Sequence, residues 1–123
     1  MIQIQVTTAS GNGWTTGFNG TLSEARSYFL GDAYVTESDT GKETRDTITG
    51  VAFVGSYGQL RVKAWEAKRD NNYELAAELY QAAFEAFPLG DTNAQAEENR
   101  KDLRMQARSM RTMALRARQE VAA

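Results

Sequence analysis

The chain opens with a strict alternation of apolar and polar side chains. Ile2, Ile4 and Val6 alternate with glutamine and threonine, which is the two-residue period of a half-buried β-strand. Turn-forming residues fill positions 9–13, and the alternation resumes over residues 14–18. This arrangement predicts an antiparallel β-hairpin at the N-terminus.

The next segment predicts a short helix and two further strands. Thr21 and Glu24 have the spacing of a capping box, and the helix that they open should end near Gly31. Residues 34–37 and 44–54 have the composition of a third and a fourth strand, joined by a turn. We therefore expect a small antiparallel sheet with one short helix.

The stretch that follows is less regular. Gly50 lies inside the fourth strand, where a glycine is typical of a bulge or a break. Residues 60–64 alternate like a strand, whereas residues 64–69 suit a helix equally well. We expect a strand that ends near Ala64.

The rest of the chain is predicted to be helical. Apolar residues from Leu75 to Phe87 recur at a spacing of three and four, and Asn71 or Asn72 is placed to cap this helix. Pro88 should end it. The last segment contains neither glycine nor proline for about 30 residues, and as one helix it would be ~45 Å long.

These elements predict an α+β fold. We expect a single domain over residues 1–123, in which residues 1–66 form mainly a small N-terminal antiparallel β-sheet with a short helix. Residues 70–122 should form a C-terminal helical hairpin that ends in the long helix. A chain of 123 residues is large enough to bury a modest hydrophobic core of its own.

An apolar seam runs along the last helix, with the spacing that packs helix against helix. A compact chain of this length has a radius of gyration near ~14 Å, so a helix of ~45 Å extends beyond what its own small sheet can cover. The sequence therefore predicts a homo-oligomer built on the C-terminal helices. The seam consists of Leu103, Ala107, Met110, Ala114, Ala117 and Val121.

Charge is distributed unevenly along the chain. The last 24 residues carry seven cations and two anions, although the net charge of the whole chain is −2. On a helix at about 100° per residue, five of these cations fall within roughly a quarter of the circumference. This arginine stripe comprises Arg100, Arg104, Arg108, Arg111 and Arg118.

Two interpretations of the arginine stripe stay open. Arginines on an amphipathic helix are commonly a solvated flank that makes surface or intersubunit salt bridges, and Glu97 is placed to pair with its neighbours in the stripe. Alternatively, the guanidinium groups converge on a phosphate, which arginine binds with two parallel hydrogen bonds. Tyr80, Phe84 and Phe87 also suit the core, but one of them could stack on a base. The second interpretation points to a nucleotide.

Missing residue types narrow the chemistry. The chain has no cysteine and no histidine, so thiolate nucleophiles, sulfur metal sites and the commonest general base at neutral pH are absent. No phosphate-binding glycine loop or nucleophile elbow occurs. We expect a protein that is not an enzyme, with no cofactor and with no catalytic or metal-binding residues.

The composition also bears on partners and compartment. A sequence pI near 5.2 argues against duplex nucleic acid as a partner, because proteins that bind it are usually basic. No apolar run approaches the ~20 residues of a membrane span, and the first residues lack the pattern of a secretory signal. We expect a cytoplasmic protein that does not bind membranes.

Two stretches of the chain carry a resemblance to a known family. They are residues 4–16, IQVTTASGNGWTT, and residues 18–31, FNGTLSEARSYFLG. Together with the order of a sheet followed by a helical hairpin with paired C-terminal arginines, they resemble the first type of Thoeris anti-defence proteins. These are phage-encoded sponges for immune signalling nucleotides, and the resemblance covers most of the chain.

The resemblance implies a non-catalytic protein that captures glycocyclic ADP-ribose between two protomers. It would withhold this signal from a host effector in the cytoplasm of the infected bacterium. Family members assemble as homodimers or as hexamers made of three dimers, and some also bind cyclic di- or trinucleotides. The main alternative is a phage structural or adaptor protein that only oligomerises through its C-terminal helices. An enzyme that acts on nucleotides through Mg²⁺ at Glu97 or Glu98 is a further alternative.

The resemblance also implies which residues bind the ligand. The family's pocket uses two arginines one turn apart on the last helix, together with an aromatic residue and an asparagine. Here Arg104 and Arg108 would clamp the diphosphate, Phe84 would stack on the adenine, and Asn93 would bond to the base or the ribose. A shift of register in the connection between the two helices would instead pair Arg108 with Arg111, or put Phe87 in the place of Phe84.

Overall fold

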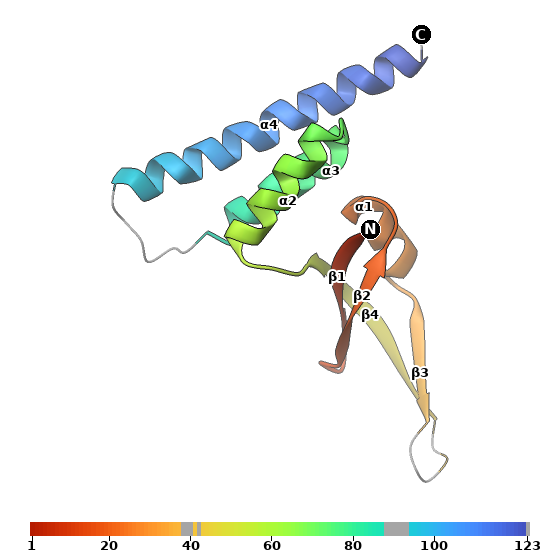
Figure 1. Cartoon of the computed structure of the whole chain (residues 1–123). Helices are drawn as coiled ribbons and strands as arrows, with labels where there is room; N and C mark the ends of the chain where they lie inside the picture. Colours follow the sequence, from red (N-terminus) through yellow and green to blue (C-terminus); the bar gives the residue numbers. More distant parts are fainter. Residues whose placement is uncertain (38–40, 42, 88–93, 123) are drawn as a thin grey trace. The chain divides into compact units, whose positions relative to one another are not determined.

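Strands fill the first part of the chain and helices the second in the computed structural model, which describes residues 1–37, 41, 43–87 and 94–122. Contacts divide the chain into two compact units, Met1–Val54 and Gly55–Ala123. Within the described residues, the first unit contains the strands and one short helix, and the second contains three helices (Figure 1). The expected α+β architecture is confirmed, with the antiparallel sheet at the N-terminus and a long helix at the C-terminus.

The first unit is built on a four-stranded antiparallel sheet, in which the strand order is β2-β1-β4-β3. The predicted N-terminal hairpin is confirmed, because β1 and β2 pair antiparallel with Ile2 opposite Phe18. The third and fourth predicted strands pair with each other in the same way. The strands are β1 (Ile2–Thr8), β2 (Gly13–Phe18), β3 (Ala33–Glu37) and β4 (Glu43–Phe53).

The alternation in β1 directs Ile4 and Val6 to one face of the sheet, where neither side chain is exposed. Val51 lies opposite Val6 on β4 and is also buried. The short helix α1 (Leu22–Phe29) packs against β4. A fully buried aliphatic side chain contributes about 1.5–3 kcal/mol, so this small core is the main source of stability in the first unit.

A bulge occurs in β4 next to Gly50, as the sequence indicated. Thr7 pairs with Gly50 whereas Thr8 pairs with Ile48, so Thr49 is the extra residue. Ile48 and Val51 are an odd number of residues apart and would point to opposite faces of a regular strand. The extra residue lets both side chains be buried.

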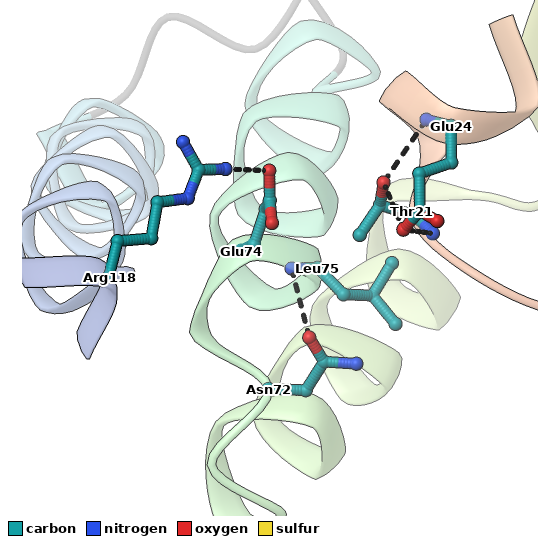
Figure 2. Close-up of polar contacts among 6 residues, drawn as sticks. All are labelled: Thr21, Glu24, Asn72, Glu74, Leu75 and Arg118. Carbon is teal, nitrogen blue, oxygen red and sulfur yellow. Dashed lines mark hydrogen bonds and ion pairs between the residues drawn. The ribbon is translucent and has the colours of Figure 1, made fainter. Parts of the chain in front are cut away.

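The predicted capping box at the start of α1 is present (Figure 2). The Thr21 hydroxyl accepts a hydrogen bond from the backbone N–H of Glu24 at 3.2 Å, and the Glu24 carboxylate accepts one from the backbone N–H of Thr21 at 3.2 Å. After the helix, Gly31 has a φ of 86°, which favours glycine over residues with a side chain. Glycine therefore ends this helix where we expected.

The second unit is a three-helix arrangement in which the middle helix packs against both others. Asn72, one of the two predicted caps, is the N-cap of the middle helix, and its side-chain oxygen accepts a hydrogen bond from the Leu75 backbone N–H at 3.5 Å (Figure 2). The expected helical hairpin is therefore present but has a third helix before it. The helices are α2 (Tyr57–Arg69), α3 (Tyr73–Glu85) and α4 (Ala94–Ala122).

The strand predicted over residues 60–64 is wrong, because these residues belong to α2. The alternation of apolar residues was misleading because Val62, one of the apolar positions, is not buried: it is 57% exposed on the helix. The sheet part consequently ends at Val54, earlier than the boundary at residue 66 that we expected. The buried residues of α2 follow helical spacing instead, and they are Leu60, Ala64 and Ala67.

The apolar seam of α4 is covered in part by the chain itself. Leu103, Ala107 and Met110 are at most 3% exposed, so these three residues need no second copy to bury them. α4 has 29 residues and α3 only 13, and beyond Met110 the burial weakens: Ala114 is half-buried and Ala117 is exposed. The side chain of Val121 lies outside those described. Among the described residues, no helix combines the length and the apolar character that crossing a membrane requires.

Candidate functional site

Four of the five predicted ligand residues line one hollow between α3 and α4. Arg104, Arg108 and Arg111 come from α4 and Phe84 comes from α3, and Gln81 is also part of the lining. The volume of the hollow is about 360 Å³. Pockets that hold small molecules fall in the range of about 300–1,000 Å³. We call this site, lined by these five residues, the cationic hollow.

Helical geometry explains why the three arginines share this place. They are spaced by four and three residues, so they lie on one side of α4. Each one directly follows a residue that is buried within the unit, and a position next to the buried face lies at the edge of the helix contact. The buried residues that precede the arginines are Leu103, Ala107 and Met110.

Arg104 and Arg108 are the two free cations of the hollow. Both are exposed, and neither guanidinium has an ion-pair or hydrogen-bond partner among the described residues. Arg111 is held, because its Nη2 donates a hydrogen bond to the Gln81 side-chain oxygen at 2.9 Å. Gln81 was not predicted as a site residue, although its position three residues before Phe84 on a predicted helix would have placed both on one side.

The other members of the arginine stripe are engaged elsewhere. Arg118 forms an ion pair with Glu74 of α3 (Figure 2). The Arg100 guanidinium lies 5.4 Å from the centre of the Phe87 ring, within the range of a cation–π contact. Glu97, which the sequence placed beside the stripe, pairs with none of its arginines among the described residues. Within the described residues a salt bridge is therefore formed by Arg118 and by none of the arginines of the hollow, whose exposed side chains also fit the solvated flank that the sequence left open.

The three candidate aromatic residues differ in burial. Tyr80 and Phe87 are each 5% exposed, so the core interpretation is confirmed for both. Phe84 is half-buried and lines the cationic hollow, which makes its ring the one available to a ligand there. Asn93, the predicted amide contact, lies outside the described residues.

The lining of the cationic hollow favours an anion with an aromatic ring. Three guanidinium groups and no described carboxylate line it, so its net charge is +3 in a chain whose net charge is −2. A hydrogen bond to a charged group typically contributes about 1.5–3 kcal/mol, and a phosphate accepts several. Half-buried Phe84 offers a face on which a planar base can stack.

The lining also limits what chemistry can take place. Arginine, glutamine and phenylalanine are not usual nucleophiles or general bases. Among the described residues, no group of three or more acidic side chains could hold a metal ion, and Glu98 lies 4.0 Å from Lys101 as an exposed ion pair.

No protein family model, curated protein sequence or solved structure matches the chain.

Proposed function

We propose that this chain binds a signalling nucleotide in the cationic hollow and sequesters it without altering it. The observation that carries the proposal is that Arg104 and Arg108, two guanidinium groups without a partner among the described residues, share one hollow with a half-buried aromatic ring, Phe84. The resemblance to the first type of Thoeris anti-defence proteins supports glycocyclic ADP-ribose as the ligand. A phage would use such a protein in the host cytoplasm to block immune signalling.

The ligand's two kinds of group match the two parts of the hollow. Arg104 and Arg108 lie one helical turn apart, so their side chains can reach neighbouring phosphates of a diphosphate. Phe84 stacks on the adenine, and Arg111 adds a third positive charge once it leaves Gln81. In the same proposal Asn93 bonds to the base or the ribose. Cyclic di- and trinucleotides carry the same groups and are candidate ligands as well.

The proposed mechanism is mass action. A protein that only binds its ligand lowers the free concentration of the signal in proportion to its own abundance and affinity. A Kd of about 1 nM corresponds to ~12 kcal/mol. The charge-assisted hydrogen bonds and the stacked ring must supply this in excess of the cost of association. We propose no turnover, no cofactor and no duplex nucleic acid as partner.

A second copy of the chain completes the site in this proposal. The cationic hollow opens to solvent, and past it on α4 Leu115 is 58% exposed and Ala117 is exposed. Apolar side chains at this end of the helix are suited to contact with another α4, as a homodimer or a hexamer of three dimers. The same exposed residues favour the alternative function, a structural or adaptor protein that only oligomerises.

A capture experiment separates these functions. The purified protein is incubated with glycocyclic ADP-ribose, passed through a filter to remove free ligand, and denatured by heat to release what it held. We expect intact ligand in the released fraction. Chemically altered ligand would indicate an enzyme, and the absence of retained ligand would favour the structural or adaptor protein. A cyclic trinucleotide is tested in parallel.

Variants connect retention to the cationic hollow. We expect the double variant Arg104→Ala and Arg108→Ala to lower retention to background while its gel-filtration volume stays that of the wild type. The matched control is Arg116→Ala, since Arg116 is an exposed arginine of α4 that does not line the hollow. Full retention by the double variant would place the ligand elsewhere and overturn the site.

A further inference from the structure

The second unit contains another hollow, which shares no lining residue with the cationic hollow and has no part in the proposed function. Its volume is about 500 Å³, and all three helices contribute to it. We call it the Trp65 hollow. Its lining includes Arg61, Trp65 and Lys68 of α2, Tyr80 of α3, and Asp102 and Gln106 of α4.

Tyr80 provides an unused hydrogen-bonding group in this hollow. The residue is 5% exposed and lines the hollow, yet its hydroxyl has no hydrogen-bond partner among the described residues. Every fully buried polar side-chain atom in the described part of the chain has a partner. The Tyr80 hydroxyl must therefore reach solvent, and the opening available to it is the hollow. A ligand atom placed there would replace water as its partner.

Trp65 provides an apolar wall that is more than half exposed. The residue is 55% exposed, because α2 turns Leu60, Ala64 and Ala67 inward and Trp65 outward. The Arg69 guanidinium lies 5.3 Å from the centre of the Trp65 ring. An exposed tryptophan that lines a hollow is typical of a binding surface.

The charges in the hollow are nearly balanced. Arg61 and Asp102 approach only to 3.9 Å, and both side chains are half exposed. Lys68 donates a hydrogen bond to Gln106 at 3.4 Å. Two cations and one anion line the hollow, so the excess is a single positive charge.

The Tyr80 hydroxyl is a donor under ordinary conditions. Burial raises the pKa of Tyr80 above its ordinary value, and Asp102 adds to this whereas Arg61 opposes it. The hydroxyl is therefore protonated at neutral pH and can donate to an anion. Arg61 lines the same hollow, so its guanidinium is available to an anion bound there as well.

We propose that the Trp65 hollow binds a planar aromatic ring that carries one anionic group, such as a carboxylate. The ring packs against Trp65, and the anionic group accepts hydrogen bonds from Tyr80 and Arg61. One negative charge on the ligand matches the single excess positive charge of the lining. A dianion would meet repulsion from Asp102, and an uncharged ring would offer no anion to Tyr80 and Arg61.

The test uses the full chain labelled with ¹⁵N and benzoate as the probe. The side-chain N–H signals of Trp65 and Trp14 are followed by nuclear magnetic resonance, with Trp14 in the first unit as the internal reference. We expect benzoate to shift the Trp65 signal saturably and to leave the Trp14 signal in place. Acetate lacks the ring and benzyl alcohol lacks the charge, so each should bind at least about tenfold more weakly, the change that 1.4 kcal/mol produces.

Variants identify the groups that recognise the anion. Tyr80→Phe removes one hydroxyl from the lining and should weaken benzoate about fivefold, the effect of one net hydrogen bond. Arg61→Gln should weaken it at least as much and serves as the second variant if Tyr80→Phe does not fold. The variant Arg104→Ala and Arg108→Ala should bind benzoate as the wild type does, which separates this site from the proposed function. Absence of a saturable shift, equal binding of benzyl alcohol, or wild-type affinity in both Tyr80→Phe and Arg61→Gln would overturn the proposal.

Discussion

Arg104 and Arg108 differ from Arg111 and Arg118 of the arginine stripe in whether a hydrogen-bond or ion-pair partner lies next to the guanidinium group. Glu74 neutralises Arg118, and Gln81 holds Arg111 by one hydrogen bond, but the guanidinium groups of Arg104 and Arg108 contact no acceptor among the described residues. A phosphate that arrives there need not displace an existing partner. This difference between residues of one type gives the cationic hollow its proposed specificity.

The same scale gives a prediction about pH. Asp46 accepts hydrogen bonds from the Ser10 hydroxyl and, at 3.1 Å, from the backbone N–H groups of Ser10 and Thr47. The Ser10 hydroxyl, with Thr8 next in importance, lowers the pKa of Asp46 below 3.8. Since the folded pKa is depressed, this contribution to stability is present above the unfolded pKa and is lost as the pH falls through the folded pKa.

We therefore expect Asp46→Asn to lower the free energy of unfolding at pH 6, and we expect the difference from the wild type to shrink as the pH falls below about 4. Urea denaturation at a series of pH values measures both. Asp32→Asn is the control, because the exposed Asp32 side chain has no hydrogen bond among the described residues. A difference for Asp46→Asn that stays constant down to pH 2 would contradict this explanation.

Single residues also show how far the sequence could predict the site. Helical periodicity places Phe84 on α3 and the three arginines on one side of α4, which is why the hollow brings them together. Gln81 was not predicted as a site residue, because a single uncharged polar residue on a helix does not by itself indicate a binding site. Hydrophobicity alone does not tell which side of a helix is covered, and the aromatic Trp65 of α2 is in fact exposed.

At the scale of elements, the α3–α4 contact holds the cationic hollow in shape. Leu103 is 1% exposed and lies directly before Arg104, so its packing fixes the position of that arginine's backbone. Met105 lies just beyond, on the same helix, and is 68% exposed. Burial, and not residue type, should decide the cost of truncating these two side chains.

We expect Leu103→Ala to lower the free energy of unfolding by about 2–5 kcal/mol, because it removes a buried side chain and leaves a cavity. Met105→Ala should change it by less than about 0.5 kcal/mol, since little apolar surface is lost. Chemical denaturation of both variants at one protein concentration gives the comparison. Similar losses in the two variants would mean that the packing of α4 is not as described.

Individual helices and strands also show which secondary structure the sequence pattern can predict and which it cannot. The hairpin, the capping box of α1 and the cap of α3 follow from local rules that act within a few residues, and these predictions are confirmed. In residues 60–64 the spacing of the apolar residues fits both the two-residue period of a strand and the 3.6-residue period of a helix. The decision depended on packing against α3, and on a second capping box formed by Ser56 and Gln59 that we had not recognised.

At the scale of the whole molecule, charge separates the proposed ligand from other polyanions. The chain has a net charge of −2 whereas the cationic hollow has +3, so attraction is strong only within about 10 Å of the hollow. A small phosphate ligand needs no more than this local field. Duplex nucleic acid would need many neutralised phosphates, whereas the chain as a whole carries more acidic than basic side chains, 16 against 14.

The apolar seam of α4 is buried within the chain over only part of its length, and this bears on how a second copy could bind. The sequence suggested that a second copy buries the whole seam, but α4 first covers Leu103, Ala107 and Met110 within its own unit. Sequence periodicity could not distinguish these residues from those further along, because the spacing is the same throughout. Leu115 and Ala117 are the residues through which we propose that a second copy joins.

Calorimetric titration with glycocyclic ADP-ribose tests the central claim, that the unpaired arginines of the cationic hollow bind a phosphorylated ligand. The proteins compared are the wild type, Arg104→Gln, Arg108→Gln and the control Arg116→Gln. We expect each of the first two variants to bind at least about tenfold more weakly, the loss of a charge-assisted hydrogen bond, and the control to bind as the wild type does. Wild-type affinity in Arg104→Gln and Arg108→Gln, or an equal loss in all three variants, would contradict the claim.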